Sequence, residues 1–494
     1  MPGPLKKFFQ LIISRLDGHK LSSTLYQKQV IDLVRKGIGG FIVFGGEEVV
    51  VSSFIDKLQL LAETPLFIAS DIERGVGQQI NGTTTFPGQM AAAAATDLNN
   101  SESLKALEDA IRAIAYESIA IGINMPLIPV LDVNSNPDNP IICTRAFSDK
   151  PAMVSRFGNM YIDTLERTGL ISCAKHFPGH GDTAVDSHIS LPVISKSVGE
   201  LNAVDLVPFI EAVKTNVSSI MMGHIRVPSI DDLPASLSGK AVDLLRTGLG
   251  YEGLILTDAL NMHALRDMRD VAVTCVNAGI DILLHPENPD TVAKELQEAV
   301  TKGEIAEEKI DTAIARILEY KARTKNIKKV RIDTDKHKAL SGTISDRSIT
   351  LVKEKNRLAP LKNVQDVSLI FMADEGKHDL SALKTFIPGS VHIRECQREV
   401  LKKAVIVALF TRIAAWEGNA GIRVEEINII RDLIKRAGIS IVISFGNPYV
   451  LRHFMDADVL IAAYDTTEQA QSSVIKCLKG EIAFQGHLPV ELKN

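Results

Sequence analysis

The 494-residue chain has little of several residue classes, and each shortage argues against a class of function. It has no basic excess, because 55 Lys and Arg residues face 60 Asp and Glu residues and the formal net charge is −5. That balance leaves no broad basic surface for nucleic acid and no polybasic patch for a membrane. Aromatic residues make up only 5% of the chain, which argues against a platform on which bases stack.

Cysteine is also scarce, since the chain has five cysteines and no two stand in a CxxC pair. Their odd number and wide scatter favour free thiols in a reducing compartment over a disulfide framework. The start, MPGPLKKFFQLIISRLDGHKL, has an apolar part that is too short and too broken for a secretory signal. No apolar run approaches the roughly 18 residues of a membrane span. The sequence therefore predicts a cytoplasmic protein without a membrane partner.

Three common motifs are missing from the chain: GxxxxGK[ST], GxSxG and HExxH. Nucleotide-binding, serine hydrolase and zinc protease functions therefore lack the features that usually anchor them. We expect neither a cofactor nor a metal ion. The length alone suggests about two to four domains.

What the first 320 residues do contain is a regular alternation of short apolar runs with longer helical patterns. The runs are 39–44, 65–71, 122–130, 170–176, 218–224, 253–258 and 279–285. Because each run is apolar on both faces, we expect a parallel sheet with helices packed outside it. Seven or eight such units favour a (β/α)8 barrel of the TIM type over an open doubly wound sheet.

Polar or ionisable residues end several of these runs, namely Asp71, Lys175 with His176, His224, Asp258 and His285. In a barrel the carboxyl ends of all strands meet on one face, where active sites form. A polar residue that merely begins a loop explains one or two of these cases but not all of them. We therefore expect the functional site at these strand ends.

The composition becomes charged and polar at residues 323–345, which predicts a linker. Beyond it the alternation resumes at 367–371, 404–410, 439–445 and 459–464. We predict a (β/α)8 catalytic domain at 1–322 and, at 346–494, a smaller C-terminal α/β sandwich domain.

The stretch KHFPGHGDTAVDSH, residues 175–188, holds three of the twelve histidines. One interpretation is a metal site, but the HxxxH spacing of His176 and His180 suits a helix, which Pro178 and the glycines prevent. A second is a solvated loop without function. The third, which we favour, is a proton-transfer loop, because Asp186 stands two residues before His188 and a neighbouring carboxylate fixes the tautomer of an imidazole and raises its pKa.

Asp258 ends the apolar run GLILTD and is therefore held by a strand rather than by a loop. Its simpler interpretation is an N-cap for residues 259–265. Together with a mobile acid/base, however, a fixed carboxylate is the minimum for double displacement at an acetal carbon.

KHFPGHGDTAVDSH followed by GLILTDALNM closely resembles glycoside hydrolase family 3, and specifically its β-N-acetylglucosaminidase (β-hexosaminidase) branch. The segment NPDNPIICTRAFSDKP at 136–151 is similar to that family's substrate-binding stretch, and the resemblance spans most of residues 30–320. FGNPYVL and GEIAFQGHLPV in the last third are similar to its two-domain members.

The resemblance implies a retaining exo-β-N-acetylglucosaminidase. Asp258 would be the nucleophile, and His188 would be the acid/base, oriented by Asp186. Sugar hydroxyls would be bound by further residues, namely Lys175, His176, Arg145, Asp71 and His224. The implied substrates are N-acetylglucosamine-containing muropeptides or chito-oligosaccharides, and the implied role is peptidoglycan recycling or chitin breakdown. We expect the protein to be a monomer or a small homo-oligomer.

One position departs from the family pattern, which has an arginine eight residues after the Asp of the second-strand motif. Here Gln79 stands at that position and Arg74 lies nearby. Three other functions stay open: a family 3 β-glucosidase or β-xylosidase, a phosphorylase in which phosphate replaces water, and an inactive sugar-binding protein. A histidine acid/base, unlike a carboxylate, does not repel an anionic acceptor.

Overall fold

The computed structural model describes residues 5–184, 191–355, 358–361, 364–373, 378–396, 401–411 and 421–492. The chain forms two compact units. The first comprises Met1–Thr85, Glu108–Val133 and Lys150–His337, and the second comprises Phe86–Leu107, Asn134–Asp149 and Lys338–Asn494.

Eight parallel strands close the barrel of the first unit. Five of them lie in the order β10-β1-β2-β3-β4 and three in the order β5-β6-β9, and the parallel bridges Val130↔Lys175 and Leu256↔Ile282 join the two sets. Their bounds are β1 Ile12–Asp17, β2 Gly40–Phe44, β3 Phe67–Ser70, β4 Met125–Pro126, β5 Cys173–Phe177, β6 Ser219–Met222, β9 Leu254–Thr257 and β10 Leu283–Leu284. The (β/α)8 prediction is therefore confirmed.

The strand that sequence analysis missed is β1, because Ser14 and Arg15 interrupt its apolar pattern. Its register is nevertheless well defined, since it pairs with β10 on one side and with β2 on the other. Strands β3, β6 and β9 are buried at every position, as expected for a sheet covered on both faces.

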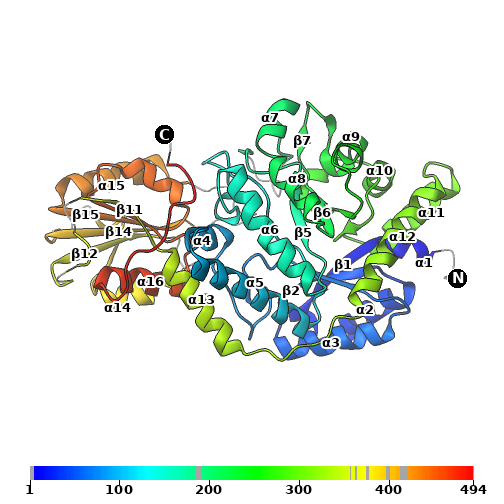
Figure 1. The fold of residues 1–494 in the computed structure, drawn as a ribbon, viewed down its shortest axis with the longest axis horizontal. Coiled ribbons are helices and arrows are strands. Elements are labelled where there is room, and N and C mark those ends of the chain that lie inside the picture. The colour runs from blue at the N-terminus through cyan, green and yellow to red at the C-terminus, as the bar shows by residue number, and fades with distance from the viewer. Residues whose placement is uncertain are drawn as a thin grey trace. The chain divides into compact units, whose positions relative to one another are not determined.

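Helices surround these strands (Figure 1). The longer ones of the first unit are α2 Thr24–Lys36, α3 Glu48–Leu61, α6 Pro151–Arg167, α8 Val207–Lys214, α10 Val271–Ala278, α11 Pro289–Thr301 and α12 Glu307–Thr324, while α5 Ser101–Ile121 runs through the boundary at residue 107. Helix α2 shows why such segments end where they do. The Ser23 hydroxyl accepts a hydrogen bond from the Tyr26 amide at the start, and Gly37 takes a left-handed conformation at the end.

The short elements of the first unit include helices α1 Lys6–Phe9, α7 Val198–Ala203 and α9 Gly239–Asp243. Strands β7 Arg226–Val227 and β8 Asp231–Pro234 pair antiparallel outside the barrel.

The second unit is a six-stranded sheet with helices on both faces. Its order is β11-β16-β15-β14-β12-β13, and every pair is parallel except β11 with β16. The strands are β11 Thr350–Glu354, β12 Val367–Met372, β13 Val391–His392, β14 Ala404–Thr411, β15 Ile439–Gly446 and β16 Val459–Ala462. The C-terminal α/β sandwich is therefore confirmed as well.

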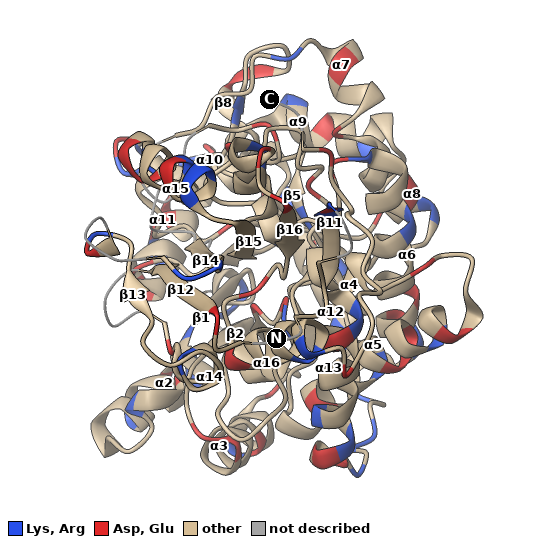
Figure 2. Ribbon diagram, turned by 90° about the vertical axis from the view of Figure 1, so that its left-hand side faces the viewer, with Lys and Arg blue, Asp and Glu red and all other residues tan. Residues whose placement is uncertain are grey.

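Alternate side chains of β14 point to opposite faces of this sheet. Val405, Val407 and Leu409 pack in one apolar cluster with helix α15 (Val424–Arg436), whereas Ile406, Ala408 and Phe410 pack in another with helix α16 (Glu468–Lys479). Figure 2 shows the sheet between α15 on one side and α16 with α14 (Ser381–Phe386) on the other, and its central strands carry no charged residue.

Two further helices bear on the domain boundaries. Helix α13 (Thr334–Ser348) lies mostly within the segment predicted to be a linker, and α4 (Gln89–Ala94) contributes Met90 and Ala91 to an apolar cluster of the second unit. The boundaries drawn from composition stay a prediction. Within the part of the chain that the structure describes, no helix has the length and apolarity needed to span a membrane.

Candidate active site at the strand ends

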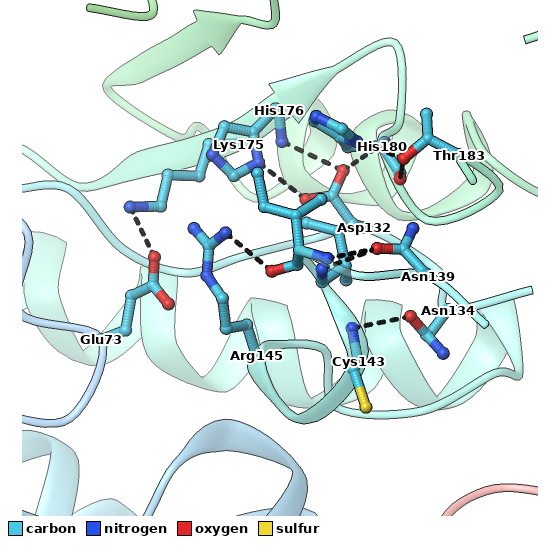
Figure 3. Close-up of polar contacts among 12 residues, drawn as sticks. Glu73, Asp132, Asn134, Asn139, Cys143, Arg145, Lys175, His176, His180 and Thr183 are labelled. Carbon is cyan, nitrogen blue, oxygen red and sulfur yellow. Dashed lines mark hydrogen bonds and ion pairs between the residues drawn. The ribbon is translucent and has the colours of Figure 1, made fainter. Parts of the chain in front are cut away.

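Lys175 and Asp71, which sequence analysis proposed separately, lie in contact. Lys175 is in β5, its side chain is 1% exposed, and its Nζ lies 2.8 Å from Oδ1 of Asp71, the residue after β3. The same Nζ lies 2.9 Å from Oε1 of Glu73, which sequence analysis did not single out (Figure 3). Because two carboxylates hold one buried ammonium, the Lys175 side chain has a fixed direction.

A second cluster centres on Asp132, which follows the β4 segment and is fully buried. Its Oδ2 lies 2.7 Å from Nδ1 of His176, and its Oδ1 accepts hydrogen bonds from the backbone amides of His176 at 3.2 Å and His180 at 2.6 Å (Figure 3). Burial raises the pKa of Asp132, but His176 and His180 outweigh this and hold it below its usual value. The carboxylate is therefore ionised and fixes the orientation of the His176 ring.

His180, the second histidine of the loop motif, is buried and points back into the protein. Its Nδ1 lies 2.8 Å from the Thr183 hydroxyl, and its ring packs edge-on to that of His176 with a centroid distance of 5.9 Å. These contacts make His180 a structural residue of the turn. Among the described residues no group of three or more His, Cys, Asp or Glu side chains is arranged to hold a metal ion.

The predicted acid/base residues, Asp186 and His188, lie outside the described residues. The base of their loop is nevertheless defined. Lys196 lies 2.8 Å from Oδ2 of the fully buried Asp205 and 3.5 Å from Oδ2 of Asp182, so one cation links the two sides of the loop. Burial raises the pKa of Asp205, an effect that Lys196 partly offsets.

Asp258 follows β9, where its backbone amide donates to the Met222 carbonyl at 2.9 Å. Its Oδ1 accepts a hydrogen bond from the next amide, Ala259, at 2.8 Å. No helix begins there, because the following turn ends in a short 3-10 helix at His263–Leu265 whose cap is Met262. The N-cap interpretation of Asp258 therefore fails, and the carboxylate stands at a strand end.

His224, predicted to touch the sugar, has no exposed surface. Its Nδ1 lies 2.7 Å from the Ser236 hydroxyl and its Nε2 lies 3.0 Å from the carbonyl of Ala259. In this arrangement His224 supports the residue beside Asp258. Its contact with a substrate stays a prediction.

Arg145 belongs to the second unit, in the loop 134–149. Its Nη1 donates to the Ile141 carbonyl at 3.1 Å, and the Asn134 side chain holds the Cys143 amide at 2.8 Å (Figure 3). The loop is tied to residues far along the chain, since Asn134 Nδ2 lies 3.0 Å from the Tyr449 hydroxyl and Arg452 forms an ion pair with Asp138.

Gln79 occupies the position where the family pattern has an arginine. Its Nε2 donates to the backbone carbonyl of Asp71 at 3.1 Å. The residue therefore holds the Asp71 backbone.

Residues 7–320 match the family described as the glycosyl hydrolase family 3 N-terminal domain. The chain belongs to glycosyl hydrolase family 3. That family places this protein among the glycosidases, enzymes that act on carbohydrates.

The relatives of this family 3 chain include a β-hexosaminidase A from Pseudoalteromonas piscicida, 33% identical over 385 residues. That alignment covers 69% of the chain and 64% of the relative, so the chain spans just under two thirds of that protein's length. A β-N-acetylglucosaminidase/β-glucosidase from Cellulomonas fimi is 27% identical over 92% of the chain and 88% of its own length.

Among solved structures, a family 3 β-N-acetylglucosaminidase from Paenibacillus sp. strain FPU-7 superposes with a TM-score of 0.83 at 28% identity, covering 99% of this chain and 98% of that one. A β-glucoside phosphorylase bound to 2FGlc superposes with a TM-score of 0.87 at 25% identity, covering 99% and 94%.

Proposed function

We propose that this family 3 protein is a retaining exo-β-N-acetylglucosaminidase that removes terminal β-linked N-acetylglucosamine. The observation that carries the proposal is the position of Asp258 directly after β9, since Asp71 directly follows β3 and Lys175 and His176 lie in the second half of β5, toward the same end of the barrel. The names of the two relatives and of the Paenibacillus structure support the choice of sugar.

The proposed reaction is a double displacement. The Asp258 carboxylate forms a bond to the anomeric carbon while the glycosidic bond breaks, and His188 gives its proton to the departing oxygen. His188 then takes a proton from water, whose oxygen attacks the same carbon and releases Asp258, so the β configuration is retained. Asp186 would orient His188 and raise its pKa, as a neighbouring carboxylate does.

The sugar would be held by groups whose directions are already set. Lys175, fixed between two carboxylates, would donate to hydroxyl oxygens, and Asp71 would accept from the hydroxyls farthest from the scissile bond. His176, oriented by Asp132, would contact a neighbouring hydroxyl through Nε2. Arg145 and His224 complete the proposed set of substrate-binding residues.

Phosphate as the second acceptor is the other candidate. It is favoured by the likeness to the β-glucoside phosphorylase and by the histidine acid/base, which carries no negative charge that would repel an anion. In that case the product would be a glycosyl phosphate instead of a free sugar.

Buried free cysteines support a reducing compartment, as in the cytoplasm. Muropeptides or chito-oligosaccharides are the proposed substrates, which would place the enzyme in peptidoglycan recycling or chitin breakdown.

Product analysis tests the proposal. The wild-type protein is incubated with nitrophenyl β-N-acetylglucosaminide and with the matching β-glucoside, each with and without phosphate. We expect faster turnover of the N-acetylglucosaminide and a β-configured first product. A free sugar would show that water is the acceptor, and a glycosyl phosphate would show that phosphate is. Preference for the glucoside, or an α-configured first product, would overturn the proposal.

A further inference from the structure

Three side chains on adjacent barrel strands form a cluster for which the proposed reaction has no use. Arg15 lies in β1, Phe44 ends β2, and His285 follows β10. The guanidinium carbon of Arg15 lies 4.9 Å from the centroid of the Phe44 ring, and the His285 ring centroid lies 5.6 Å from the same point. We call these three residues the arginine cluster.

Arg15 keeps most of its hydrogen-bonding capacity. Its side chain is 48% exposed, and its ion-pair partner is Asp17, at 3.3 Å. Lys20 lies 3.7 Å from the same carboxylate oxygen of Asp17, so two cations share one carboxylate and the local charge is positive. A guanidinium has five N–H donors, and a single contact at this distance leaves the others available.

His285 adds an imidazole ring, and the residue as a whole is 8% exposed. No hydrogen bond to this ring is found among the described residues, and the ring packs against that of Phe44 at an interplanar angle of 40°. Burial and the charge of Arg15 lower the pKa of His285 to about 4, so the ring is neutral at pH 7. Neither ring nitrogen of His285 is among the fully buried polar atoms that lack a partner, so the ring still reaches solvent, where its N–H can donate to an oxygen ligand.

His285 also has a strained backbone, with φ of 49°. Non-glycine residues seldom adopt this left-handed conformation, and where they do the site is often functional.

The cluster borders the proposed sugar-binding groups. Phe44 ends β2, β2 pairs with β3, and Asp71 follows β3, so the cluster and Asp71 lie at the ends of neighbouring strands. Lys175 lies 2.8 Å from Asp71 and 2.9 Å from Glu73, so its charge offsets part of the negative charge of these two carboxylates.

We propose that Arg15 and His285 form a binding site for an oxyanion, a carboxylate or a phosphate, next to the sugar held by Asp71 and Lys175. Arg15 supplies the charge and paired donors that suit such a group, and the neutral His285 ring supplies one more N–H donor. The location of the sugar rests on the proposed function, whereas the anion site rests on the cluster itself. The oxyanion is either free phosphate or an acidic substituent of the substrate.

Titration calorimetry tests the site without requiring turnover. The probes are sodium phosphate and an N-acetylglucosaminide whose sugar ring carries a carboxylate ether, and the proteins are wild type, Arg15→Gln and Lys20→Gln. Lys20→Gln is the matched control, because it removes the same charge beside the same Asp17 without approaching Phe44. We expect wild type to bind at least one probe, Arg15→Gln to weaken it roughly 10- to 100-fold, and Lys20→Gln to bind nearly as wild type.

The two sources of the oxyanion give different kinetics. If phosphate is the ligand, it yields a glycosyl phosphate from a neutral substrate with wild type but not with Arg15→Gln. If the ligand is part of the substrate, Arg15→Gln lowers kcat/KM for the carboxylated substrate at least 10-fold more than for the neutral one. The site is disproved if wild type binds neither probe, or if Arg15→Gln binds them as wild type does. If binding is found but no N-acetylglucosaminide is turned over, only the proposed function fails.

Discussion

Replacement of Asp132 by asparagine tests whether this buried carboxylate positions His176 for sugar binding. Oδ1 of Asp132 accepts both backbone amides, from His176 and His180, while Oδ2 faces Nδ1 of His176. In Asp132→Asn the amide oxygen can keep both backbone contacts, and the amide nitrogen then meets the imidazole. An N–H donor there forces Nδ1 to become an acceptor, so the ring proton moves to Nε2.

The magnitude follows from the bonds that change. The variant loses one hydrogen bond to an ionised group, worth about 1.5–3 kcal/mol. If His176 is needed in its native tautomer, this corresponds to a fall in kcat/KM of roughly 10- to 150-fold. Asp132→Ala, by contrast, leaves both backbone amides and Nδ1 of His176 without their acceptor, which costs folding stability about 1–3 kcal/mol for each unsatisfied buried group.

The assay combines kcat/KM on the nitrophenyl N-acetylglucosaminide with a thermal melt and the ¹⁵N shifts of the His176 ring. We expect Asp132→Asn to melt close to wild type, to show the other tautomer and to lose activity. Wild-type kcat/KM in a variant whose tautomer has changed would refute the positioning role. So would activity losses in Asp132→Asn and Asp132→Ala that simply follow their losses of stability.

Three further predictions concern stability and proton transfer. Burial lowers the pKa of Lys321 from 10.5 to about 7, which corresponds to about 5 kcal/mol. Below pH 7 the lysine is charged in both states, and the folded state is destabilised by this full amount. The destabilisation disappears as the pH rises from 7 toward 10.5, because the folded state then holds the lysine in its neutral form. Thermal melts should therefore show Lys321→Met stabilised most at pH 6 and least above pH 10; destabilisation at pH 6 would contradict this. Lys196→Met should cost about 3–5 kcal/mol at pH 7 because it leaves Asp205 buried without its cation. The cost should shrink as the pH falls, since burial raises the pKa of Asp205 and favours its protonated form, and Asp205→Asn in the same chain should restore part of the loss. His188→Ala should lower kcat/KM far less for a nitrophenyl substrate than for a disaccharide, since a good leaving group needs little acid assistance; equal losses on both would exclude the acid role.

The architecture was largely predictable because alternating apolar runs and helical patterns dominate both units. The exceptions have local causes. Strand β1 contains Ser14 and Arg15 and does not look like a buried strand, although its other positions are buried. In the second unit β13 has only two residues and β11 ends in Lys353 and Glu354, so neither gives a strong periodic signal.

The site was predictable where residues mark strand ends, and less so where they act on one another. Asp71, Lys175 and Asp258 follow from position alone, but the contact between Asp71 and Lys175 spans 104 positions and depends on barrel closure. Asp132 follows the predicted strand at 122–130 and carries the same strand-end signal, yet its partner His176 is 44 positions away. The anchoring of Asn134 by Tyr449 spans 315 positions, and no local pattern reveals it.

The most direct test of the central assignment is mass spectrometry of the Asp258 peptide after the enzyme is quenched in acid during turnover of an N-acetylglucosaminide. We predict a covalent adduct with the mass of one N-acetylhexosamine on Asp258 in the wild-type enzyme, and neither adduct nor turnover in Asp258→Ala with an unchanged thermal melt. An adduct on another residue, or full activity in Asp258→Ala, would contradict the assignment of Asp258 as the nucleophile.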